Sequence, residues 1–270
     1  MKKLFLAFAV VALLVSCGNK PKQEAAVDNV EETSFEQDQI EQSIKLQIDS
    51  LAVELSKMDD TPFIHAIKEG KLELTEAEKQ VKPDFLFNPA ETNELVALSQ
   101  KYRAIAVLSA DKYIAQIYGQ PIDEYEAAIK KMVVDIDDPA FKIFIEAADT
   151  ATHEQIITDF YNAEKESGRI NLFWETTSAY MIEELYLISK DPSGKLIESF
   201  TDESASKITY RIALFQNALE KLKTYDPNLN EICDAIKPLE KLNAINVEQM
   251  KQQMAEMNND LQEIREYLLK

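Results

Sequence analysis

The chain has 270 residues, of which 48 are acidic and 29 are basic, so its net charge at neutral pH is −19. Nucleic acid and anionic lipid headgroups repel so acidic a protein, which excludes a nucleic-acid partner and purely electrostatic attachment to a membrane. The 5 glycines fall far below the usual ~7% of residues, and a chain rich in Ala, Leu, Glu and Lys is predicted to be all-α.

The first residues have the layout of a secretory signal. Lys2 and Lys3 precede an apolar run over residues 4–15, which is shorter than the roughly 20 residues of a spanning helix. Residues 14–17, Leu-Val-Ser-Cys, resemble the lipobox of bacterial lipoproteins. Residues 1–16 are therefore predicted to be a signal peptide. An ordinary signal cut elsewhere, with Cys17 incidental, is the alternative.

The lipobox resemblance implies that Cys17 carries lipid and becomes the first residue of the exported protein. Two or more acyl chains hold a protein stably at a membrane. The residue after the cysteine is Gly18 rather than Asp, which by resemblance favours the outer membrane, on its periplasmic or surface face. We therefore expect a lipid-anchored protein of the bacterial cell envelope. Cys233 then has no intramolecular disulfide partner and is expected to be a buried apolar residue.

Helical periodicity dominates the rest of the chain. Residues 17–33 are predicted to form the lipidated cysteine and a disordered tether, and residues 34–270 a helical bundle domain. A Thr33-x-x-Glu36 capping box opens the first helix, which ends near Met58. Further helices are expected at about 63–69, after Thr75, and at 93–118 (capped by Thr92), 122–136, 139–148, 152–168, 170–189, 202–225, 229–242 (bent at Pro238) and 246–270 (capped by Asn246).

No segment alternates with period two, so no sheet is predicted. The expected architecture is an irregular multi-helix bundle with long central helices. Between the helices, residues 84–87 contain Phe85 and Phe87, which are expected to plug a groove on the bundle.

The last expected helix carries a heptad-like apolar seam. Met250, Met254, Met257 and Leu261 follow one another at steps of three and four residues. This seam either closes the chain's own bundle or accepts a helix of an envelope protein partner. Three adaptable methionine side chains in succession favour the partner interpretation.

A second candidate site lies between the expected helices 93–118 and 170–189. Its residues are Tyr102, Arg103, Trp174, Tyr180 and Glu184. Arg103 and Glu184 lie at the edges of facing apolar stripes and could form a partly buried ion pair. Alternatively, these residues line a pocket between helices for a planar or anionic small molecule.

Motifs for catalysis and for cofactors are missing from the sequence. Neither His65 nor His153 is part of a Glu-x-x-His pair, and no phosphate-binding or dinucleotide-binding glycine motif is present. We therefore expect no metal site, no cofactor and no enzymatic activity. An envelope enzyme is the weakest of the functional alternatives.

The segments 99–104 and 110–111, together with Trp174 and residues 184–187, resemble helical lipoproteins of Bacteroidota-type bacteria, a group without an assigned activity. The resemblance carries over no functional residue. The function expected from the sequence is a lipid-anchored binding or scaffolding protein that acts through protein contacts. The alternative is a small-molecule-binding module with its pocket between the two central helices.

Overall fold

The computed structural model describes residues 28–146 and 152–270, with side chains from residue 38 onward and outside 143–151. The predicted signal peptide and Cys17 lie outside the described residues. The chain divides into two units, residues 1–43 and residues 44–270.

The described residues form helices joined by short loops, with no strand among them, which confirms an all-α multi-helix bundle. The helices are α1 (Asp28–Ser56), α2 (Pro62–Lys68), α3 (Glu76–Lys79), η1 (Pro89–Glu94), α4 (Leu98–Ile117), α5 (Asp123–Ile136), α6 (Pro139–Glu146), α7 (His153–Glu166), α8 (Ile170–Lys190), α9 (Lys195–Glu198), α10 (Asp202–Leu222), α11 (Leu229–Ile236), η2 (Lys237–Lys241), α12 (Val247–Glu256) and α13 (Asn258–Leu268).

Two helix starts differ from those predicted. Helix α1 begins at Asp28, inside the expected tether, so Thr33 lies within the helix and does not open it. Helix α4 begins at Leu98, because Pro89 starts a separate 3₁₀ turn that takes up Thr92. The Gln100 side chain accepts the backbone N–H of Ala97 at 2.8 Å and so satisfies the start of α4.

Three helix starts that were predicted from a local cap are confirmed. The Thr75 side chain and Glu78 form the reciprocal capping box of α3. Thr152 Oγ1 accepts the N–H of Gln155 at the start of α7, and Asn246 Oδ1 accepts that of Gln249 at the start of α12. Each of these three caps involves residues within one turn, so the sequence pattern alone indicated it.

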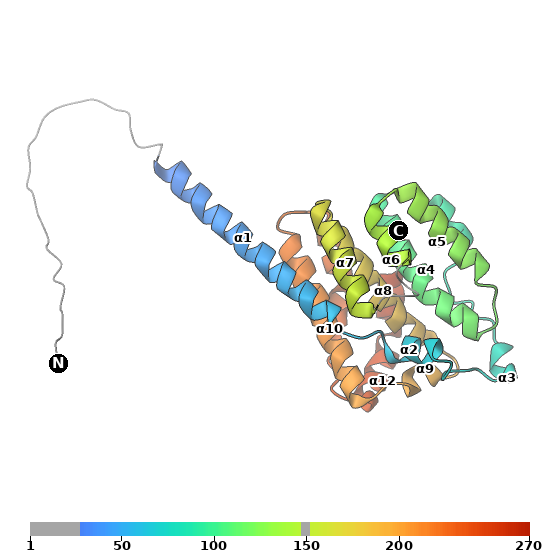
Figure 1. The fold of residues 1–270 in the computed structure, drawn as a ribbon. Coiled ribbons are helices and arrows are strands. Elements are labelled where there is room, and N and C mark those ends of the chain that lie inside the picture. Colours follow the sequence, from blue (N-terminus) through green and yellow to red (C-terminus); the bar gives the residue numbers. More distant parts are fainter. Residues whose placement is uncertain (1–27, 147–151) are drawn as a thin grey trace, which may run out of the picture. The chain divides into compact units, whose positions relative to one another are not determined.

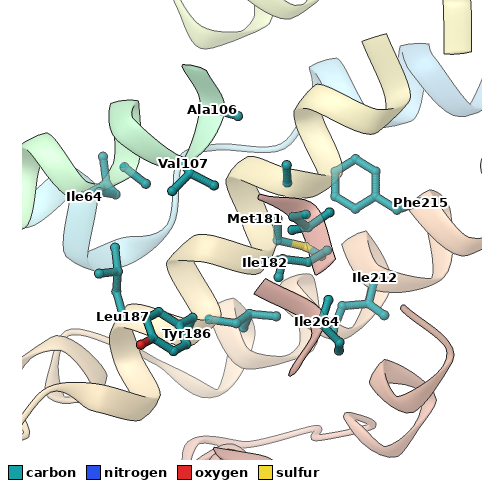
Figure 2. Close-up of a cluster of buried hydrophobic side chains, with 14 of the residues drawn as sticks. Ile64, Ala106, Val107, Met181, Ile182, Tyr186, Leu187, Ile212, Phe215 and Ile264 are labelled. Carbon is teal, nitrogen blue, oxygen red and sulfur yellow. The ribbon is translucent and has the colours of Figure 1, made fainter. Parts of the chain in front are cut away.

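Helix α8 is the centre of the 44–270 unit. It packs most extensively against α4 and also contacts α7, α10, α12 and α13 (Figure 1). Figure 2 shows Met181 and Ile182 of α8 gathered with Ile212 and Phe215 of α10 and with Ile264 of α13. All five side chains are at most 2% exposed. Residues 172–188 of α8 are buried with the exception of Tyr180, including three glutamates, so the helix is enclosed on nearly every side.

The predicted C-terminal helix is broken into α12 and α13 at Met257, whose backbone leaves the helical region at φ −93° and ψ 5°. The seam residues Met250, Met254, Met257 and Leu261 are 0–3% exposed. They pack into the chain's own core, because α13 lies against α8 and α11. The exposed seam that a partner helix would need is therefore not present.

Candidate functional site

Three glutamates of α8 each meet an arginine from a different helix. Arg103 of α4 donates through Nη1 to Glu175 at 2.6 Å and through Nε to the carbonyl of Leu268 at 2.8 Å. The predicted Arg103–Glu184 ion pair is therefore wrong. The reason is helical geometry: at 100° per residue, Glu175 and Glu184 lie on opposite sides of α8.

Glu184 points instead toward α10. Thr61 donates to its Oε1 at 2.5 Å, and Arg211 Nη1 lies 3.7 Å from its Oε2. Glu184 is fully buried, and Oε2 has no hydrogen-bond partner among the described residues. Burial is the largest influence and raises the pKa of Glu184 to about 8, although Arg211 and Thr61 act in the opposite direction.

Tyr102 and Trp174 are also enclosed in the core. Both are 0% exposed. The Tyr102 hydroxyl donates to Asp138, while the Trp174 ring meets Phe215 edge-on with 6.1 Å between ring centroids. Trp174 thus faces α10 rather than sharing a face toward α4. The expected open pocket around Tyr102, Arg103 and Trp174 is occupied by packed side chains.

A cavity of about 650 Å³ does occur between the central helices, on a different part of their surfaces. Residues from α4, α5, α7, α8 and α10 line most of it, and Leu55 of α1, Asp60, Lys68 and Lys142 complete the lining. Of the five predicted pocket residues, only Tyr180 lies on its wall. The volume is within the range of ~300–1,000 Å³ that is typical of small-molecule sites.

The inner wall of this cavity is apolar. Its lining includes Leu55, Ala106, Ile129, Val133, Ile157, Met181 and Phe215, each at most 7% exposed. The hydroxyls of Thr176 and Thr177, which also line the wall, donate to backbone carbonyls of their own helix. They therefore present methyl groups more readily than free polar groups to the cavity.

The cationic side chains along the cavity are Lys68, Lys112, Lys130, Lys142 and Arg211. Two acidic residues, Asp60 and Glu126, also line it. This excess of positive charge is opposite to that of the whole chain, in which acidic residues outnumber basic ones by 48 to 29. The charge around the cavity is therefore positive, although the chain as a whole is negative.

One edge of the cavity is fixed by Asp60. Lys68 Nζ lies 2.5 Å from its Oδ2, and His153 Nδ1 lies 3.0 Å from its Oδ1. Burial raises the pKa of Asp60, but the hydrogen bond from His153 and the charges of His153 and Lys68 outweigh burial and hold that pKa well below its usual value. Asp60 is consequently ionised near neutral pH, and its two oxygens are already paired with Lys68 and His153.

Sequence reasoning missed most of this cavity because its lining comes from segments that are distant along the chain. Helix α5 supplies Ile129, Lys130 and Val133, yet its packing neighbours are α4 and η1. The one usable signal was the amphipathic pattern of residues 123–136, where exposed Lys130 adjoins buried Ile129. That pattern describes any surface helix and does not indicate a cavity.

Comparisons of the chain with protein-family models, curated proteins and solved structures gave no match. Within residues 28–146 and 152–270, no helix is both long and apolar enough to cross a membrane. Over the same described part, no group of three or more His, Cys, Asp or Glu side chains is placed to hold a metal ion.

Proposed function

We propose that this chain is a small-molecule-binding module and that the cavity between α4, α5, α7, α8 and α10 is its binding site. The observation that carries the proposal is a cavity of about 650 Å³ with an apolar inner wall and charged side chains along its margin. Binding sites combine largely apolar walls with a few polar groups that fix orientation.

The alternative of a scaffold that acts through the C-terminal seam has less support. Its main argument was an exposed stripe of methionines, and Met250, Met254 and Met257 are at most 3% exposed. Protein contacts through other surfaces have no specific observation in their favour. We therefore rank ligand binding above scaffolding.

The binding proposal predicts that the purified chain binds a neutral apolar fluorophore, N-phenyl-1-naphthylamine, at one saturable site. Ser109 lines the cavity from α4 and is half-buried. Ser109→Trp should therefore fill the cavity and weaken fluorophore binding at least tenfold. Fluorescence titration measures the affinity, and circular dichroism checks that the variant keeps its helical content.

Ser99→Trp is the matched control, because Ser99 is also a half-buried serine of α4 but does not line the cavity. It should bind the fluorophore like the unchanged chain. Equal affinities of the two tryptophan variants, or no saturable binding by the unchanged chain, would contradict the cavity as the site.

We further propose that the binding domain is held at the bacterial cell envelope by lipid on Cys17, at the outer membrane. Support comes from the lipobox-like residues 14–17 and from the net charge of −19, which leaves the chain without an electrostatic means of holding an anionic membrane. The ligand would then be encountered at the envelope.

Cys17→Ala is expected to abolish lipid attachment when the chain is expressed in a bacterium that processes lipoproteins. Intact-mass spectrometry should find acyl chains on a product that begins at Cys17, and fractionation should find that product in the membrane. The variant should lack the acyl mass, whereas Cys233→Ala should keep it. A Cys17→Ala product with the same acyl mass and membrane fraction would overturn the anchor.

A further inference from the structure

The cavity that we propose as the binding site has lysines of three helices at its margin, and these lysines are weakly neutralised. Lys112 of α4 lies 3.5 Å from Glu126, and Lys142 of α6 lies 3.6 Å from Asp137, whose side chain is 87% exposed. Lys112 is half-buried and the other three side chains are exposed, and solvent-accessible pairs of this length contribute little, so an arriving anion can replace them.

Lys130 of α5 is the least engaged of these cations. It is exposed, lines the cavity, and has no carboxylate within ion-pair distance among the described residues. Lys68 and Arg211 differ, because Asp60 holds Lys68, and Glu184 with the Asp59 carbonyl engages Arg211. Three lysines at the margin therefore remain for a ligand.

Exposure divides the cavity into a polar mouth and an apolar interior. Lys130 and Lys142 are exposed at the margin, while Ala106, Met181 and Phe215 are 0–2% exposed on the inner wall. Burial of apolar ligand surface supplies roughly 25 cal/mol per Å², so an apolar part gains most from the inner wall. An acidic group gains most from the ammonium groups at the mouth.

From this division we infer that the ligand is a single-chain amphiphile with one acidic head group, bound with its apolar part against Met181 and Phe215 and its head at Lys112, Lys130 and Lys142. The inference rests on the proposed binding function and adds the ligand class to it. A small hydrophilic anion lacks the apolar part, and a cationic amphiphile meets an excess of like charge.

Three amphiphiles with the same ten-carbon chain test the head group: decanoate, decanol and decyltrimethylammonium, each below its micelle concentration. Each competes with N-phenyl-1-naphthylamine on the purified full chain. Decanoate should displace the fluorophore at concentrations at least tenfold lower than decanol, and decyltrimethylammonium should be the weakest competitor. Equal potency of decanoate and decanol would overturn the assignment of an acidic head group.

The double variant Lys130→Glu/Lys142→Glu should remove the advantage of decanoate and leave displacement by decanol unchanged. Lys82→Glu/Lys251→Glu is the matched control, because both lysines are exposed and neither lines the cavity. It makes the same change in net charge. An equal loss in both double variants would mean that overall charge, not the mouth of the cavity, selects anions, and would overturn the inference.

The two proposals fail in different ways. The proposed binding function is wrong if the fluorophore does not bind at a saturable site, or if it binds Ser109→Trp as well as the unchanged chain. The inferred ligand class is then wrong too. If the fluorophore binds in the cavity and decanol competes as well as decanoate, only the acidic head group is wrong.

Discussion

Arg265→Met is expected to lower the free energy of unfolding by about 3–5 kcal/mol, because it leaves the buried carboxylate of Glu183 without its cation. Burial and the neighbouring charge of Glu183 raise the pKa of Asp111 well above its ordinary value, so the stranded charge is that of Glu183. Arg265 Nε lies 2.9 and 2.7 Å from the two oxygens of Glu183, and Nη2 lies 3.6 Å from Asp111 Oδ2. Glu183 and Asp111 are both 0% exposed. Urea denaturation at pH 7 measures the loss.

The double variant Arg265→Met/Glu183→Gln should recover part of the stability, because it removes the stranded charge of Glu183. Lys241→Met is the control for loss of a surface pair. Lys241 lies 2.6 Å from Asp260, but its side chain is 63% exposed. Removal of such a pair should change stability by less than ~1 kcal/mol. Similar losses in Arg265→Met and Lys241→Met would show that burial of the paired carboxylate does not determine how much stability is lost.

The second large effect is a stability difference that depends on pH. Burial raises the pKa of Glu184 from its ordinary value near 4.5 to about 8 in the folded protein. Between these values the unfolded chain releases the proton while the folded chain keeps it, so the contribution of Glu184 to stability falls as pH rises. Glu184→Gln has no such proton, so its free energy of unfolding should exceed that of the unchanged chain by about 4 kcal/mol at pH 8.

The advantage of Glu184→Gln should shrink to about 1 kcal/mol near pH 5 and vanish only below the unfolded pKa, where Glu184 is protonated in both states, and it should stay constant above the folded pKa. Urea denaturation of both proteins at pH 5, 6.5 and 8 measures this difference. The lowered pKa of Asp60 keeps that carboxyl ionised over this pH range in both proteins, so Asp60 adds no trend of its own. Glu248→Gln, at an exposed position, should show no comparable trend. A constant difference across this range would contradict a buried, under-paired Glu184.

The fold class and most helices followed from the sequence, since they depend on local patterns. The caps at Thr75, Thr152 and Asn246 each involve residues within one turn. The break at Met257 was missed, because an apolar seam at steps of three and four residues continues unchanged across it. Whether such a seam is straight or bent depends on what it packs against, here α8 and α11.

The candidate site could be predicted less well, because it depends on how each helix is rotated about its axis. The sequence placed Glu184 and Trp174 toward α4, whereas both face α10 in the structure. A rotation of half a turn exchanges Glu175 for Glu184 at a given interface, and both positions are acidic and buried. Tertiary packing, rather than local pattern, decides between them.

The four arginines of the chain are its only guanidinium groups, and each reaches a buried carboxylate. Arg103, Arg211 and Arg265 hold the glutamates of α8, and Arg169 holds Asp138. No lysine of the described residues is buried. The buried ion pairs thus use guanidinium groups, whereas the cations at the mouth of the cavity are ammonium groups. Mutations can therefore change the lysines around the mouth without removing the arginines that pair with the glutamates of α8.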